Sequence, residues 1–221
     1  MKRIVLLLAL SLVLSSLTGP ALAETPWYMG VSGGSGEVEV VGHDRGAEVQ
    51  KALSEADLGV NSTAGAEDDG TSVWKIFAGY WINDNWAIEA SYQDLGHTSG
   101  TFSSSVSQNG STSNLNGKLK SEYDAVASSI VGKRNFNRWV GVYGRAGVHY
   151  WQHDFSAKGS NNLGISVDET VTDNGFDYLY GGGVVGYLSE SISVRLDWER
   201  FHGIEDEEGV DIKTLTTVYR F

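Results

Sequence analysis

The sequence predicts an all-β fold: an eight-stranded antiparallel up-and-down transmembrane β-barrel with short turns at one end and long loops at the other. Three observations predict it. Segments of about ten residues alternate apolar with polar side chains, short and long connections alternate between these segments, and the last segment ends on the aromatic residue Phe221. Alternation with a period of two is typical of a strand whose two faces meet different surroundings.

The first residues predict an export signal. Two basic residues precede the almost wholly apolar residues 4–14, and an Ala-Leu-Ala sequence ends at Ala23, just before Glu24. This is the pattern of a secretory signal peptide with its cleavage site. The alternative, a membrane anchor, needs a longer apolar run. We therefore predict a cleaved signal peptide over residues 1–23 and one barrel domain over residues 24–221.

Composition excludes several partner classes. Of the 16 basic residues, two lie in the signal, so the remaining 14 face 28 acidic residues and the net charge is about −14. Nucleic-acid binders need basic surface, so no nucleic acid is expected as a partner. The chain lacks cysteine, which excludes disulfides and thiolate-bound metal.

Three segments in the first half of the chain alternate clearly. Within residues 27–38, 72–82 and 86–95, apolar or aromatic side chains stand at alternate positions: Trp27, Met29 and Val31 in the first, Trp74 to Ile82 in the second and Trp86 to Tyr92 in the third. The Asn-Asp-Asn sequence at 83–85 predicts a tight turn between the second and third segments. A fourth strand is expected over residues 122–132, where the alternation is too weak to fix the inward face.

Four further strands follow in the second half. Residues 138–153 alternate over a long stretch, after a turn at 135–137. The sixth strand is expected at 176–187, and the seventh, at 192–201, alternates again. The eighth begins near Val210 and ends at the last residue.

The connections are of two kinds. Strands two and three, four and five, and six and seven are joined by a few residues, whereas the others are joined by residues 39–71, 96–121, 156–175 and the shorter 203–209. Short periplasmic turns and long extracellular loops are typical of a bacterial outer-membrane barrel. Spans of about ten residues suffice for tilted strands to cross the bilayer, and closure satisfies their backbone groups in lipid. The predicted location is the bacterial outer membrane.

The charged residues of the strands lie opposite the aromatic face. They are Lys75, Glu89, Arg145, Arg195, Asp197 and Glu199. A soluble, lipocalin-like barrel would show the same pattern inverted, but aromatic residues near strand ends favour interfacial belts in a membrane. We expect the six to form a lumen charge network with a structural role, because side chains fill a barrel of this size. A gated, narrow ion path is the alternative.

The sequence also resembles a known family. Residues 74–80, followed by 83–89 and 92–96, resemble the second hairpin of the outer-membrane protein A-like and opacity-protein-like eight-stranded barrels. The ending Tyr219-Arg220-Phe221 resembles the terminal strand of this family. The resemblance implies that Tyr219 and Phe221 form the signal read by the barrel assembly machinery.

The resemblance has consequences for the lumen. Glu89 and Arg195 match a lumenal Glu–Arg pair of the family, which implies that they pair here. Family members can also carry a Glu on the sixth strand and a Lys on the fourth. Here the sixth-strand position falls near Gly186, and the middle of the fourth strand has no Lys, so the switchable ion-pair plug is not implied.

The loops offer weaker candidates. Residues 46–58 have the spacing of a short amphipathic helix, and residues 99–116 are rich in Ser, Asn, Gly and Thr, which predicts a flexible loop. Acidic runs at 67–69 and 205–208 lack the ligand spacing of a Ca²⁺ site and are expected to be solvated. Outer-membrane lipid and lipopolysaccharide are the expected surroundings, with an extracellular ligand possible through the loops.

An enzymatic role finds little support in the sequence. His149, His153 and Ser156 lie near the end of one strand, but the His-x-Ser pattern of lipid A deacylases is missing. The other histidines are isolated, so no metal or cofactor is expected. We therefore expect a non-catalytic barrel with structural and surface-interaction roles. The alternatives are a narrow ion or small-solute channel and, less favoured, a lipid A-modifying enzyme.

Overall fold

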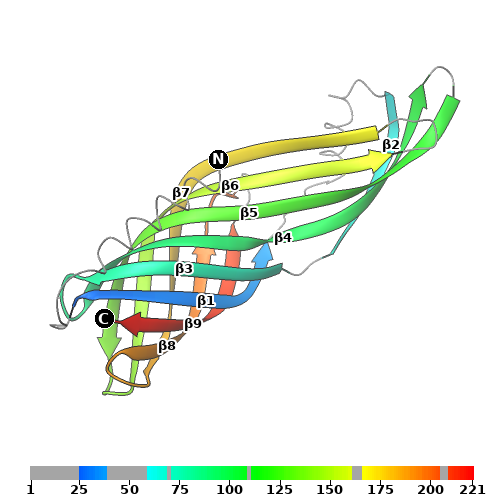
Figure 1. The fold of residues 1–221 in the computed structure, drawn as a ribbon. Coiled ribbons are helices and arrows are strands. Elements are labelled where there is room, and N and C mark those ends of the chain that lie inside the picture. Colours follow the sequence, from blue (N-terminus) through cyan, green and yellow to red (C-terminus); the bar gives the residue numbers. More distant parts are fainter. Residues whose placement is uncertain (1–24, 39–58, 69–70, 109–110, 161–165, 205–208) are drawn as a thin grey trace.

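The computed structural model describes residues 25–38, 59–68, 71–108, 111–160, 166–204 and 209–221 (Figure 1). These form nine antiparallel strands: β1 (Trp27–Val38), β2 (Gly59–Asp68), β3 (Thr71–Trp81), β4 (Trp86–Gln108), β5 (Ser111–Asn135), β6 (Val140–Ser160), β7 (Ser166–Tyr187), β8 (Ile192–Phe201) and β9 (Val210–Arg220). In the described part of the chain, no helix has the length and apolar character needed to cross a membrane. The predicted signal peptide and cleavage site, the candidate helix and the acidic run at 205–208 lie outside the described residues.

Eight of the nine strands close into the predicted antiparallel barrel. The pairing order is β4-β3-β1-β9-β8-β7-β6-β5, and β4 pairs with β5 to complete the cylinder. Strand β1 lies between β3 and β9, so Trp27 at the start of β1 and Phe221 after β9 lie together at one end of the barrel. Closure leaves no free strand edge among these eight within the lipid.

Three tight turns stand at the end of the barrel where β1 begins and β9 ends. In the first, the Asn83 side chain accepts hydrogen bonds from the backbone N–H of Asn85 and of Trp86, each at 2.9 Å. The other turns repeat this with Asn137 and Ser189 as the side-chain acceptors. Asn and Ser favour such turns because their side chains replace backbone partners. The predicted short turns are thus confirmed.

The opposite end differs from the expectation. β4, β5, β6 and β7 are 23, 25, 21 and 22 residues long, about twice what a bilayer crossing requires. They continue past the ends of β1, β8 and β9 (Figure 1). The ninth strand, β2, lies outside the barrel and pairs with the far half of β4. We use the name extension for β2 together with the parts of β4–β7 beyond the ends of β1, β8 and β9, residues 97–108, 111–122, 154–160 and 166–172.

The prediction of long loops was therefore wrong at 96–121 and 156–175, where most residues are in strands, as was the flexible loop at 99–116. Of the predicted loop at 39–71, residues 59–68 and 71 are in strands, and the others lie outside the described residues. Ser- and Thr-rich segments pair in register, for example residues 99–108 of β4 with residues 111–120 of β5. Thr is a good strand former, and the backbone ladder satisfies polar groups whatever the side chains are. The sequence feature that could have indicated these strands is the set of apolar residues Phe102, Leu115 and Leu119, which are buried in this region. The high Ser, Thr and Gly content around them made the segments look like loops.

The two faces of the barrel wall have the predicted orientation. Leu196, in the middle of β8, is 64% exposed on the outside, and Ile76 and Ile88 are also exposed. Exposed aromatic side chains lie near the ends of β1, β3, β4, β8 and β9 and in the middle of the long strands β6 and β7: Trp27, Trp74, Tyr80, Trp86, Tyr150, Phe176, Tyr178, Trp198 and Tyr219. The six charged residues predicted for the lumen are all buried, at 6% exposure or less.

The structure also settles the inward face of β5, the fourth strand of the sequence prediction. Tyr123, Ala127 and Val131 point inward and are buried, whereas Val126 and Ile130 are exposed. The alternation was weak because β5 places small and apolar residues on both faces, so hydropathy did not distinguish lumen from lipid.

Candidate functional site in the barrel lumen

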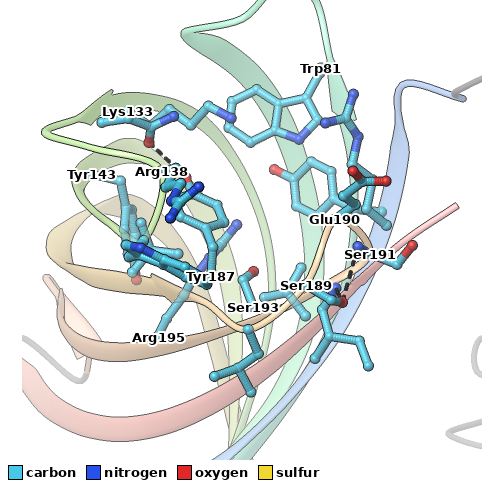
Figure 2. A pocket seen from close by; sticks show the side chains of 18 of the residues that line it. Trp81, Lys133, Arg138, Tyr143, Tyr187, Ser189, Glu190, Ser191, Ser193 and Arg195 are labelled. Atoms are coloured by element: carbon cyan, nitrogen blue, oxygen red, sulfur yellow. Dashed lines mark hydrogen bonds between the residues drawn. The ribbon is translucent and has the colours of Figure 1, made fainter.

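The lumen contains three layers of side chains. The first lies at the end with the tight turns, which is the periplasmic end. There a cavity of about 540 Å³ opens between the turns (Figure 2); we call it the vestibule. Its floor is an apolar and aromatic layer: Tyr28, Phe77, Ala87, Val131, Tyr143, Val185 and Val218.

Tyr28 reaches across the lumen because the facing position is glycine. A Cβ atom on Gly79 would lie 2.2 Å from Cζ of Tyr28, so any other residue at this position would displace the ring. The ring stacks on Trp81 with 5.3 Å between centroids. Its hydroxyl donates a hydrogen bond of 2.7 Å to Oε1 of Glu89. The aromatic layer is thereby tied to the charged layer next to it.

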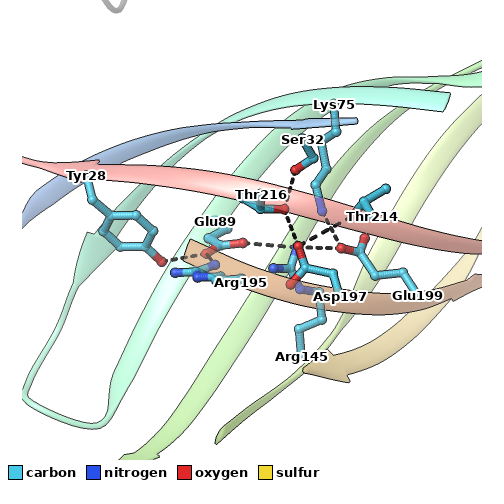
Figure 3. Close-up of polar contacts among 10 residues, drawn as sticks. All are labelled: Tyr28, Ser32, Lys75, Glu89, Arg145, Arg195, Asp197, Glu199, Thr214 and Thr216. Atoms are coloured by element: carbon cyan, nitrogen blue, oxygen red, sulfur yellow. Dashed lines mark hydrogen bonds and ion pairs between the residues drawn. The ribbon is translucent and has the colours of Figure 1, made fainter. Parts of the chain in front are cut away.

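Glu89 is the centre of the charged layer (Figure 3). Its Oε1 accepts a hydrogen bond from Nη1 of Arg195 at 3.0 Å, besides the bond from Tyr28. Its Oε2 lies 3.1 Å from Nη1 of Arg145. One carboxylate thus accepts hydrogen bonds from a phenol and a guanidinium group and forms an ion pair with a second guanidinium group, all from different strands.

Arg145 connects this group to a second carboxylate. Its Nη1 lies 3.2 Å from Oε1 of Glu199, and the same oxygen pairs with the Lys75 ammonium. Asp197, the third carboxylate, accepts hydrogen bonds from the hydroxyls of Thr214 and Thr216. Arg195 also lies over the Tyr143 ring, with 4.8 Å from Cζ to its centroid.

The layer therefore gathers all six predicted residues: three cations and three carboxylates whose formal charges cancel. Its members come from β3, β4, β6 and β8. Charges removed from water need partners to offset the loss of hydration, and the balanced set supplies them. The sequence prediction missed Tyr28, Thr214 and Thr216, although they stand at inward positions of the first and last strands.

The third layer fills the extracellular half of the lumen. Its apolar members are each at most 6% exposed: Val73, Leu95, Tyr123, Ala125, Ala127, Trp151, Leu179, Phe201, Ile204, Val210 and Ile212. The buried rings of His149 and His153 pack against Phe201 and Tyr123 in the same layer. Because the second and third layers are both buried, water has no continuous path past their side chains. The described part of the lumen is therefore closed across these two layers.

The candidate hydrolytic residues are not brought together. His149 lies inside the barrel with Nε2 3.0 Å from the carbonyl oxygen of His202, and His153 stacks on Tyr123 at 4.3 Å. Ser156 is three residues further along the strand and so lies on the opposite face. Within the described ranges, no group of three His, Asp or Glu side chains is placed to hold a metal ion.

The pair implied by the family resemblance is present as Glu89–Arg195. The remaining members differ from the family pattern: the lysine comes from β3 as Lys75, and the second glutamate comes from β8 as Glu199. Gly186 offers no charge, as expected. The C-terminal residues Tyr219 and Phe221 pack edge-on at 5.2 Å between ring centroids at the periplasmic end; their role as an assembly signal stays a prediction.

Comparison with known families decides what the fold is. Residues 7–221 match the sequence model of the family described as outer membrane protein beta-barrel domain. The chain belongs to this family. It is therefore a bacterial outer-membrane β-barrel, with its wall in lipid and the tight turns in the periplasm.

Solved structures of outer-membrane β-barrels are also similar to the chain. The attachment invasion locus protein Ail of Yersinia pestis, solved with the heparin analogue sucrose octasulfate, is 17% identical, with a TM-score of 0.44 over 88% of this chain and 99% of Ail. The N-terminal barrel domain of Pseudomonas aeruginosa OprF is 11% identical, with a TM-score of 0.46 over 89% and 98%. Neisserial surface protein A is 13% identical, with a TM-score of 0.45 over 89% and 98%. No curated protein matches the chain by sequence.

Proposed function

We propose that this protein is a non-catalytic structural barrel that keeps its lumen closed and acts at the cell surface through its extension. The observation that carries the proposal is that two successive buried layers fill the lumen. The charged layer contains three cations and three carboxylates, so its formal charges cancel, and the third layer is mainly aliphatic and aromatic. Such a barrel stabilises the membrane wall and displays its extracellular part, without serving as a passage.

Ion passage is opposed by both layers. An ion entering the charged layer has to displace partners that already neutralise one another, such as Arg145 between Glu89 and Glu199. An ion in the third layer exchanges most of its hydration for aliphatic and aromatic side chains, which costs several kcal/mol. Both effects favour the structural role over the narrow channel.

The extension supplies the surface for interactions. Its strands are hydrogen-bonded to one another in register, so a partner would meet a preformed surface and lose little binding energy to ordering it. Its outward face carries exposed ion pairs, Lys120–Glu122 at 3.0 Å and Lys158–Asp168 at 2.9 Å. We assign lipopolysaccharide and lipid to the exposed aromatic side chains of the wall, an extracellular ligand to the extension, and the assembly machinery to the C-terminal aromatic residues.

Conductance in planar bilayers tests the closed lumen. We expect the inserted protein to give no steady current, because side chains fill its cross-section. A general porin inserted in the same bilayers shows that the measurement would detect an open pore. A steady, ion-selective current that changes in Glu89→Ala would contradict the proposal and establish the channel.

Lipid A analysis tests the non-catalytic role. The inward, packed positions of His149 and His153 leave Ser156 without either of these histidines on its own face of β6. We expect mass spectra of lipid A to be the same from cells with and without the protein. A mass shift that depends on the protein and is lost in Ser156→Ala would show that it is an enzyme.

A further inference from the structure

We propose that the vestibule is a binding site for an organic anion that carries an apolar or aromatic portion. Its volume of about 540 Å³ lies within the roughly 300–1,000 Å³ of small-molecule sites. It opens to the periplasm between the three tight turns and ends blindly on the Tyr28 and Tyr143 layer. A molecule that enters is therefore held rather than passed on.

Charge selects an anion. Four cationic side chains line the vestibule, Lys133, Arg138, Arg195 and Arg220, against the single carboxylate of Glu190. The whole chain carries a net charge of −12, so this concentration of positive charge is opposite to the rest of the molecule. A concave wall of one sign in low-dielectric surroundings attracts counter-charged solutes.

Aromatic rings select the apolar portion. Trp81, Trp139 and Tyr187 line the vestibule with its cations. Lys133 Nζ lies 3.9 Å from the Trp81 ring centroid, and Arg138 Cζ lies 4.9 Å from that of Trp139. Both cations thus lie against rings, and Asp84 is the carboxylate that acts electrostatically on Lys133. An anion in the vestibule can receive charge-assisted hydrogen bonds from both.

The walls are held in place by their own hydrogen bonds. The Tyr187 hydroxyl donates to Oδ1 of Asn135 at 2.7 Å, joining two of the turns, and Ser189 Oγ accepts from the backbone N–H of Ile192 at 3.0 Å. The Lys133 backbone N–H donates to the carbonyl oxygen of Asn85 at 2.8 Å. A preformed site loses less free energy to ordering when it binds.

Two sources offer this chemistry: a soluble periplasmic solute with a phosphate or carboxylate, and the headgroup region of an anionic phospholipid. Both present an anion attached to an apolar portion. In the second case, a lipid of the surrounding bilayer would itself occupy the vestibule. Changing the lipid composition around the barrel therefore distinguishes the two sources.

The test uses the full chain folded in phosphatidylcholine nanodiscs and titrated with 1-naphthyl phosphate, with 1-naphthol as the neutral probe. Binding is followed by the NMR signals of the indole N–H groups of Trp81 and Trp139. We expect the phosphate to bind at least about tenfold more tightly than the naphthol, since a hydrogen bond to a charged group accounts for roughly that factor. Binding should also weaken as salt is added.

Matched variants locate the site. Lys133→Gln and Arg220→Gln should each weaken binding of the phosphate about tenfold. Lys118→Gln removes an exposed cation in the extension and should leave binding unchanged. Equal affinity for the two probes, or binding insensitive to salt, overturns the proposal even if a variant fails to fold. In nanodiscs with phosphatidylglycerol, a lower apparent affinity assigns the site to lipid headgroups, and an unchanged one assigns it to soluble anions.

Discussion

Replacing Glu89 by glutamine is expected to destabilise the folded barrel by about 3–5 kcal/mol, because it leaves buried charges without their partner. Glutamine has nearly the same volume, so packing is preserved. It removes the negative charge shared by Arg145 and Arg195, both of which are almost fully buried. The charged layer then holds three cations against two carboxylates.

Equilibrium unfolding in phospholipid vesicles, followed by tryptophan fluorescence, measures this loss. The matched control is Glu122→Gln, whose carboxylate pairs with Lys120 in the extension with both side chains about half exposed. An exposed pair contributes at most about 1 kcal/mol. If Glu89→Gln loses no more stability than this control, the charged layer does not stabilise the barrel.

The residues of the charged layer could be predicted from the sequence because their inward orientation follows from the alternation of side chains along each strand. Residues such as Lys75, Glu89 and Arg195 stand opposite the aliphatic face of their own strands, and a closed barrel has only one inside. The alternation and the sign of each charge therefore sufficed to place them together. The family resemblance implied one pair, Glu89 with Arg195, which is present. The partners of Arg145, Lys75 and Glu199 depend on the register between strands, which cannot be read from the sequence.

The hydrogen-bond partners of the layer were missed for that reason. Tyr28 comes from β1, and Thr214 and Thr216 come from β9, which are distant in sequence and joined only when the barrel closes. The side chains of these three residues are also uncharged, so the sequence offered no reason to place them in a charged layer. Tyr28 additionally depends on Gly79 in β3, a small residue whose role is visible only once the two strands are paired.

The vestibule and the extension were missed for different reasons. Lys133, Arg138 and Arg220 lie in or beside turns and at the chain end, where isolated basic residues usually indicate nothing more than solvent exposure. The extension has the composition of a loop, whereas its strands are stabilised by backbone ladders between segments. Composition predicts the local preference of a segment for strand or loop, but it gives no information about pairing between distant segments.

Replacing Leu196 by arginine is expected to cost about 2–4 kcal/mol, the penalty for an arginine at the bilayer midplane on the lipid face of a barrel. Leu196 is in the middle of β8 and pairs with Val184 and Leu215, which are also exposed on the outside. A residue that is 64% exposed would tolerate arginine in a water-soluble protein, because surface substitutions usually change stability by about 0.5 kcal/mol or less.

A second arginine variant, placed outside the bilayer, serves as the control that shows whether Leu196 faces lipid. Thr170 lies in the extension and is exposed, so Thr170→Arg adds the same group outside the bilayer and is expected to leave the unfolding free energy in vesicles unchanged. Only the depth in the membrane differs between the two variants, and the penalty for arginine falls toward zero near the interfaces. Equal free energies of unfolding for the two would mean that Leu196 does not face acyl chains, and the charged layer would then lie in a soluble barrel rather than in a membrane wall.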